Sequence, residues 1–193
     1  MRKIGITTAL LLVFAFMALS NGPSPASAQE PITCNLLTPT IVMTEPGAIR
    51  GTSGDDVIVG TAGDDIIDAG SGNDTVCGEG GNDVIRTGDG NDQMWGEAFR
   101  DDILIGAAGN DVLDSGPGDD LLVDPTGFGQ VLRAGDGADR VIGFGTLDGG
   151  AGDDNIRVLG GAAGPSTLSG GPDTDTCTPF SASDIVRSCE VLP

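Results

Sequence analysis

A nine-residue period dominates this sequence from Gly51 onward. The segment Gly51-Thr-Ser-Gly-Asp-Asp-Val-Ile-Val is followed directly by Gly60-Thr-Ala-Gly-Asp-Asp-Ile-Ile-Asp, and the pattern stays in register to residue 95. After a one-residue insertion it resumes and runs to residue 123, and it becomes degenerate over residues 124–157. Self-similarity at a fixed short period is typical of solenoid folds, in which a repeat buries its apolar side chain only by stacking on its neighbours.

Each repeat has two halves with different physical properties. Positions one to six hold glycine, small and acidic residues, which suit a tight turn with positive φ and close backbone approach. Positions seven to nine alternate as in a very short strand, so that only the eighth side chain points inward. The expected inward residues are Ile58, Ile67, Val76, Ile85, Met94, Leu104, Leu113, Leu122, Val141 and Ile156. The sequence therefore predicts an all-β fold, a parallel roll with one thin row of aliphatic side chains in each sheet.

An acid occupies the sixth position of most copies, namely Asp56, Asp65, Asp74, Asp83, Asp92, Asp102, Asp111, Asp120, Asp139 and Asp154. Ca²⁺ takes six to eight oxygen ligands and tolerates irregular geometry. Glycine-rich turns offer backbone carbonyls, and the sixth position adds a carboxylate. Stacked turns bring these carboxylates together, where each contact at 4 Å costs about 1 kcal/mol in water. An ion between turns reverses that repulsion, so we expect calcium binding and folding to be coupled.

The repeat resembles G-G-x-G-x-D-x-U-x, the nonapeptide of the hemolysin-type (RTX) calcium-binding proteins. The resemblance covers residues 51–123 almost continuously and 134–157 in part. It implies a right-handed parallel β-roll in which two repeats make one turn and each Ca²⁺ lies between turns two repeats apart, held by carbonyls and the sixth-position Asp. For this chain it implies ions bracketed by Asp56 with Asp74, Asp65 with Asp83, Asp74 with Asp92, and Asp102 with Asp120.

Other interpretations of the acidic positions are weaker. The chain has no His and its cysteines are scattered, which argues against zinc, and Mg²⁺ demands stricter octahedral geometry. Solvated loop charge does not explain the fixed spacing. Position five is Asp or Asn in most copies, and the sequence leaves open whether these residues form the turn or bind the ion. They are Asp55, Asp64, Asn73, Asn82 and Asn91.

The sequence also argues against an enzyme. Without His, neither an H-E-x-x-H zinc protease nor a Ser-His-Asp arrangement can form, and no G-x-S-x-G elbow is present. The paired carboxylates that a glycosidase needs are already explained by the repeat. Segments 29–50 and 158–193, which flank the array, are too short for a catalytic domain and are expected to act as caps.

The first 28 residues predict export. Arg2 and Lys3 precede an apolar run, and Ala26 to Ala28 form an A-x-A cleavage site, so residues 1–28 are predicted to be a cleaved signal peptide. No apolar stretch reaches the ~20 residues that a membrane span requires, so membrane insertion is not expected. These residues hold two of the nine basic residues and none of the 29 acids, so the remainder carries a formal charge of −22 and is a poor partner for nucleic acid.

Four cysteines remain in the predicted mature chain, and an even number in an exported protein favours two disulfides, for which three pairings exist. Cys177 and Cys189 flank the last degenerate copy. Cys34 precedes the array, and Cys77 occupies a ninth position whose side chain should face outward. A rod keeps its two ends apart, so we expect the pairs Cys177–Cys189 and Cys34–Cys77.

The sequence therefore predicts a secreted calcium-binding repeat protein, either extracellular or held at the cell surface. The alternative is a calcium-stabilised adhesive or matrix protein with an unknown surface partner, which exposed hydrophobic patches would favour. Candidate outward aromatic residues are Trp95, Phe99, Phe128 and Phe144. We also expect the regular block 51–95 to bind calcium more tightly than the rest, because Arg100 stands where a fourth-position glycine is expected.

Overall fold

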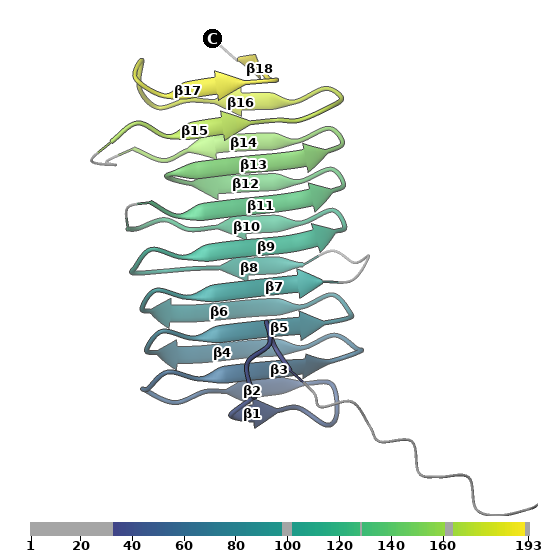
Figure 1. Ribbon diagram of the computed structural model, residues 1–193. Helices are drawn as coiled ribbons and strands as arrows, with labels where there is room; N and C mark the ends of the chain where they lie inside the picture. The colour runs from purple at the N-terminus through teal and green to yellow at the C-terminus, as the bar shows by residue number, and fades with distance from the viewer. Residues whose placement is uncertain (1–32, 98–101, 128, 161–163, 192–193) are drawn as a thin grey trace, which may run out of the picture. The chain divides into compact units, whose positions relative to one another are not determined.

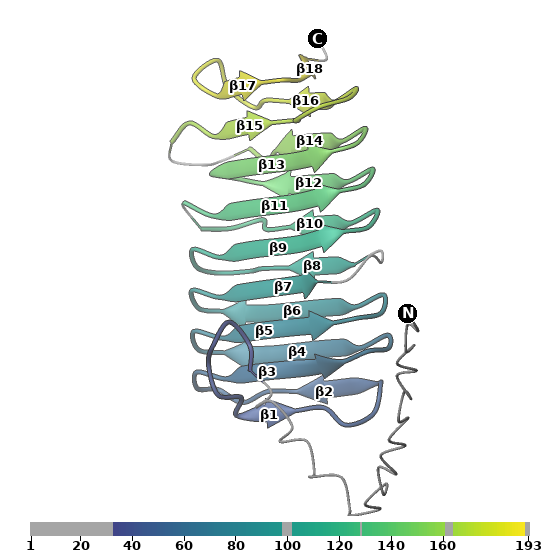
Figure 2. The same ribbon diagram turned by 45° about the vertical axis from the view of Figure 1, so that its right-hand side comes forward.

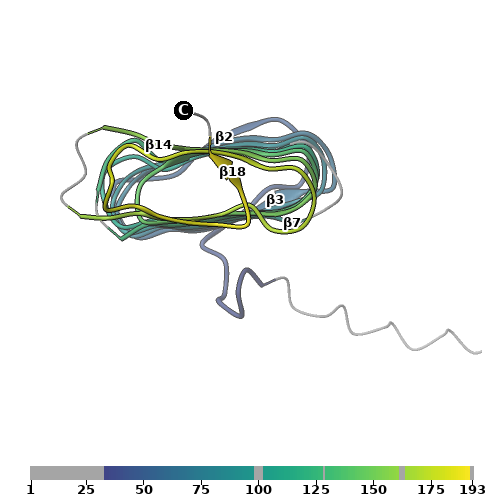
Figure 3. The ribbon, with the colours of Figure 1, turned by 90° about the horizontal axis from the view of Figure 1, so that it is seen from above.

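The computed structural model describes residues 33–97, 102–127, 129–160 and 164–191, which contain β-strands and turns and no helix. The strands form two parallel sheets of nine strands each. The chain alternates between the sheets strand by strand, so that two strands and their loops make one of about eight turns (Figure 1). Seen along the stack, the two sheets face each other across a narrow interior (Figure 3). The predicted all-β parallel solenoid is confirmed.

The odd-numbered strands form the first sheet: β1 (Ile41–Val42), β3 (Val57–Thr61), β5 (Thr75–Glu79), β7 (Gln93–Glu97), β9 (Val112–Pro117), β11 (Val131–Asp136), β13 (Thr146–Ala151), β15 (Thr167–Ser169) and β17 (Ile185–Arg187). The even-numbered strands form the second sheet: β2 (Ala48–Arg50), β4 (Ile66–Ser71), β6 (Val84–Asp89), β8 (Ile103–Ile105), β10 (Leu121–Val123), β12 (Arg140–Gly143), β14 (Asn155–Val158), β16 (Thr176–Thr178) and β18 (Glu190–Val191). Strands β1 and β2 at one end, and β15 to β18 at the other, extend the same two sheets beyond the recognisable array.

The core is the single row of inward side chains that the repeat predicts in each sheet. All ten expected inward residues are fully buried. Register explains the rows: Ile58 pairs with Val76 and Val76 with Met94, each one turn apart. The irregular copies continue the rows with residues that the repeat pattern does not single out, namely Leu132, Leu147, Leu168 and Cys177.

The aromatic residues only partly match the expectation that they face outward. Trp95 lies on the outer face of β7, half-buried against Cys77. The prediction for Phe144 was wrong, because its side chain is only 7% exposed and packs in the core. Phe144 stands in the connection between β12 and β13, which is too short for a six-residue turn. Phe99, Arg100 and Phe128 lie outside the described residues.

Two disulfides join the pairs that the sequence favours, Cys34 with Cys77 and Cys177 with Cys189. Cys77 points outward from β5 and is nevertheless buried, because the segment before β1 crosses over the outer side of β3 and β5 (Figure 2). Cys34, Cys77 and Val59 form a small apolar cluster there, separate from the main core. The N-terminal segment is thus strapped across the first turns of the roll.

Candidate metal centre

The loops between strands form two edges of the roll. Loops that run from the second sheet to the first make the first loop edge, and loops that run back make the second loop edge. The first loop edge carries four predicted site residues, Asp56, Asp74, Asp92 and Asp111. The second carries the other six, Asp65, Asp83, Asp102, Asp120, Asp139 and Asp154, and it continues with Asp175 from the last degenerate repeat. That copy is recognisable in the sequence, but its acid was not among the predicted site residues.

Each loop edge contains a ladder of carboxylates. Oδ1 of a sixth-position Asp accepts a hydrogen bond from the backbone N–H of the equivalent residue one turn earlier, as Asp74 Oδ1 does from Asp56 at 2.9 Å. On the second loop edge the ladder is unbroken from Asp65, which accepts from Gly47, to Asp175, which accepts from Asp154. On the first loop edge it ends at Asp111, which accepts from Asp92. The two residues of each pair that the resemblance implied therefore lie on successive turns of the same loop edge.

The second oxygen of these carboxylates faces a different environment. The sixth-position Asp side chains are all at most 5% exposed. At the start of the array Oδ2 has donors, because Asp56 accepts from Thr52 and Asp65 from Thr61 through both N–H and hydroxyl. Further along, Oδ2 is buried without a hydrogen-bond partner in the described part of the chain at Asp74, Asp83, Asp139, Asp154 and Asp175. Burying such an oxygen without a donor or cation is strongly unfavourable.

Glycines at position one show what surrounds Oδ2. A Cβ built on Gly60 would lie 2.8 Å from Asp65 Oδ2 and would overlap the carbonyl oxygen of Gly78 on the next turn. Gly51 has the same relation to Asp56 Oδ2, at 2.9 Å, and to the carbonyl of Ala69. A carboxylate oxygen and a carbonyl oxygen thus converge at the same place, and glycine leaves that place open. Such an oxygen-only donor set fits a hard cation such as Ca²⁺.

Side chains alone do not complete such a site. Among the described residues, no group of three or more His, Cys, Asp or Glu side chains is placed to hold a metal ion. Backbone carbonyls must therefore supply part of any coordination, which is consistent with the glycine-rich turns.

The electrostatics of the ladder also favour a cation. Burial and the charge of neighbouring carboxylates raise the pKa of Asp83 and Asp154 to about 6 and that of Asp139 to about 7, although backbone hydrogen bonds oppose the shift. Burial alone would raise the pKa of Asp56 as well, but hydrogen bonds from Thr52 and Thr40 hold it below its ordinary value. The carboxylates that lack donors are those whose ionised form needs a positive partner.

The sequence left open whether position-five residues form the turn or bind the ion. Their side chains lie exposed and join successive turns. Asp55 Oδ1 accepts from the N–H of Asn73 at 2.8 Å, and Asn73 Oδ1 accepts from Asn91 at 3.0 Å. This outer ladder runs in the opposite direction to the sixth-position ladder, because each side chain accepts from the following turn. These oxygens are therefore engaged in stacking the turns.

A comparison with protein families identifies the same nine-residue repeat. The family model of the RTX calcium-binding nonapeptide repeat matches four stretches, residues 50–85, 78–102, 99–122 and 146–162. This chain is an RTX-repeat protein. The matched stretches include every predicted site residue of the RTX-repeat protein except Asp139. No curated protein matches the sequence.

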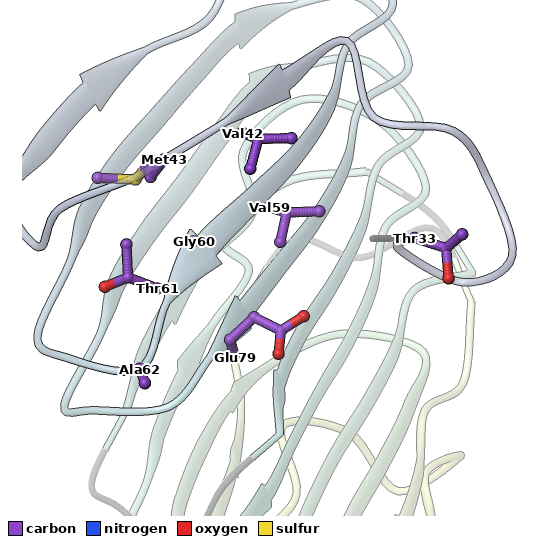
Figure 4. A pocket seen from close by; sticks show the side chains of 8 residues that line it. All are labelled: Thr33, Val42, Met43, Val59, Gly60, Thr61, Ala62 and Glu79. Carbon is purple, nitrogen blue, oxygen red and sulfur yellow. The ribbon is translucent and has the colours of Figure 1, made fainter. Parts of the chain in front are cut away.

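A hollow of about 340 Å³ lies beside β1 and β3 (Figure 4). Its lining is largely apolar, with Val42, Met43 and Val59, and contributes one carboxylate, Glu79, and two threonine hydroxyls. These groups form neither a nucleophile–base pair nor a pair of carboxylates. No helix in the described ranges is long and apolar enough to cross a membrane.

Proposed function

We propose that this RTX-repeat protein is a secreted calcium-binding protein in which Ca²⁺ held between stacked turns drives folding of the roll. The observation that carries the proposal is the burial of the sixth-position carboxylates of Asp74, Asp83, Asp139 and Asp154, whose Oδ2 atoms have no donor among the described residues. Their like charges lie one turn apart along each loop edge, so the metal-free roll opposes its own stacking. The bound ion supplies the positive charge that this arrangement lacks.

The residues that would hold calcium are the ten sixth-position acids predicted from the repeat, together with Asp175. In all of them except Asp56, Oδ1 already accepts from the backbone of the preceding turn, which orients the carboxylate and turns Oδ2 toward the ion; Asp56 Oδ1 accepts from the hydroxyl of Thr40 instead. Carbonyl oxygens of position-one residues on the next turn, such as that of Gly78, would complete part of the coordination. Each ion would therefore join two turns rather than sit within one.

The proposal includes export and the absence of catalysis. Two disulfides indicate an oxidising compartment, and the predicted signal peptide at residues 1–28 leads to one. The charge of −22 supports folding outside the cell, where calcium is plentiful. Zero His and a roll occupied by repeats support a binding protein rather than an enzyme.

Circular dichroism of the purified chain tests the proposal. In chelator we expect little β structure, and millimolar Ca²⁺ should produce a cooperative gain of β signal, because extracellular calcium modules bind at about 10⁻⁴–10⁻³ M. Mg²⁺ at the same concentration serves as the control for ionic screening. A spectrum that calcium leaves unchanged would contradict the proposal.

One surface favours the alternative of an adhesive or matrix role. On the outer face of the second sheet, Val84, Ile103 and Leu121 form one partly exposed row. A parallel row consists of Ile105, Val123 and Ile142. Arg86, Arg140 and Arg157 border these rows in a chain that has few cations. A contiguous apolar patch of this kind is typical of an interaction surface.

Retention on a phenyl-substituted resin in calcium tests this alternative. Ile103→Ser combined with Leu121→Ser should shorten retention. The control Ile185→Ser changes an exposed residue of the other sheet and should leave retention nearly unchanged. Equal elution of both variants and the wild type would count against an adhesive patch.

A further inference from the structure

The irregular repeat 124–133 does not lose its acid but carries it at another position. Gln130 stands at the sixth position on the first loop edge, just before Val131, which pairs with Val112 in the neighbouring strand. Asp124 stands at position one, where other copies have glycine or another small residue. Both side chains are fully buried. A buried acid at this position has no role in the consensus repeat.

Asp124 faces the last carboxylate of the first ladder. A Cβ built on Gly106, in the preceding turn, would lie 2.6 Å from Asp111 Oδ2 and 3.0 Å from Asp124 Oδ2. The two carboxyl groups are in direct contact. Asp111 Oδ2 accepts from the N–H of Ala107 at 3.3 Å, whereas Asp124 Oδ2 is buried without a hydrogen-bond partner among the described residues. Two acidic oxygens therefore converge on the open face of a glycine.

Gln130 and Thr126 position Asp124 for this encounter. Gln130 Nε2 donates to Asp124 Oδ1 at 3.5 Å and also to the carbonyl of Thr126. The N–H of Thr126 donates to the same Asp124 oxygen at 3.4 Å. Both donors engage Oδ1, so Oδ2 is left toward Asp111. Gln130 Oε1 is itself buried without a partner in the described residues, which adds a further oxygen near the cluster.

In the part of the chain that the structure describes, no ion pair involves either of these acids. The ion pair found within the described residues joins Arg50 to Asp68, on the outer face of the second sheet. Buried acids this close to each other require a proton or a metal ion between them. The surrounding donors are carboxylate, amide and carbonyl oxygens, which are ligands of Ca²⁺ rather than of Zn²⁺.

We propose that Asp111 and Asp124 hold a calcium ion at a site of non-consensus composition, in which the position-one Asp124 replaces the missing sixth-position acid. The proposal rests on the function proposed above, since it assigns a further calcium site to the same roll. Gln130 acts as a positioning residue. Calcium binding on the first loop edge thereby continues one turn beyond the end of the Asp ladder.

Counting calcium ions per chain tests the site. Equilibrium dialysis of the full chain against saturating Ca²⁺, with metal analysis of the retained protein, should give about one ion fewer for Asp124→Asn than for the wild type. The matched control Asp114→Asn changes a half-buried acid on the outer face of β9 and should keep the wild-type number. Combining Asp124→Gly with Gln130→Asp rebuilds the consensus repeat and should restore the number.

The outcomes separate this site from the general function. A wild-type chain that retains no calcium would overturn the function proposed above. A wild type that retains calcium while Asp124→Asn retains the same number would overturn only the Asp111–Asp124 site. If Asp124→Asn does not fold in calcium, crystals of the wild type grown with Ca²⁺ decide the question. Anomalous scattering between Asp111 and Asp124 supports the site, and its absence there beside peaks in other loops refutes it.

Discussion

At the scale of single residues, position two of the repeat determines how closely turns can stack. Gly88 has a φ of +92°, and a Cβ there would overlap the carbonyl oxygen of Gly70 in the turn below. Glu79 and Glu97 adopt positive φ values at the same position, which is unfavourable for residues with a side chain. Where glycine stands at this position, as at Gly70 and Gly88, it serves a steric purpose as well as a conformational one.

We predict that Gly88→Ala destabilises the calcium-loaded roll by about 3 kcal/mol, the range expected when backbone conflict and a strained φ act together. Urea unfolding in saturating calcium measures the loss. The control is Gly54→Ala, because a Cβ at Gly54 meets nothing closer than the Thr52 hydroxyl at 3.9 Å and needs no positive φ. Similar stability of the two variants would show that the turns are not held at this spacing in solution.

At the scale of elements, the irregular repeats fall unevenly on the two loop edges. The interruptions at Gln130 and at Phe144 both lie on the first loop edge, whereas the second keeps seven successive Asp residues. Regularity along the sequence had suggested that the block 51–95 binds calcium more tightly. Because successive repeats alternate between the two loop edges, Asp139 from the irregular part of the array lies within the longer ladder, that of the second loop edge.

We therefore predict that Asp139→Asn raises the calcium concentration at the folding midpoint at least as much as Asp74→Asn does. Asp139 Oδ2, like Asp74 Oδ2, is buried without a donor among the described residues. Four Asp residues precede Asp139 in its ladder, whereas one precedes Asp74, and two follow each of them. Calcium titration followed by circular dichroism compares the two variants. A clearly larger effect of Asp74→Asn would instead support the ranking based on sequence regularity.

The two disulfides offer a second comparison between elements. Cys34–Cys77 closes 43 residues and Cys177–Cys189 closes 12. On the chain-entropy estimate these bridges contribute about 4 and about 3 kcal/mol respectively. We expect that replacing both Cys34 and Cys77 with serine lowers the free energy of unfolding more than replacing both Cys177 and Cys189 with serine. Chemical denaturation in calcium checks the order, and a reversed order would mean that the N-terminal strap contributes little.

At the scale of the whole molecule, burial couples protons and calcium. Burial disfavours the ionised form of five carboxyl groups and so raises their pKa above the ordinary value of 3.8. The pKa is about 6 for Asp83, Asp92 and Asp154 and about 7 for Asp124 and Asp139. Between about pH 4 and pH 7 the folded metal-free chain retains protons that the unfolded chain releases. These groups therefore favour the metal-free fold at low pH and lose that contribution as pH rises through 6 to 7.

We accordingly predict opposite pH responses with and without calcium. In chelator the chain should hold more β structure at pH 5 than at pH 8. In the presence of calcium, the concentration needed for folding should increase as pH falls from 8 to 5, because protons compete for the same oxygens. Parallel calcium and chelator series in circular dichroism measure both trends. A calcium midpoint that does not change with pH would argue that carboxylates are not the ligands.

The repeat by itself determined the fold class, the inward rows and the sixth-position acids, because a nine-residue period leaves stacking as the only way to bury one side chain per repeat. Cys34–Cys77 followed for the same reason, since a roll keeps its ends apart. Only the tertiary structure showed that Phe144 fills the core and that position-five side chains link the turns. It also brought Asp124 against Asp111. These contacts join residues on different turns, and an irregular repeat carries no local signal of which oxygen it will meet one turn away.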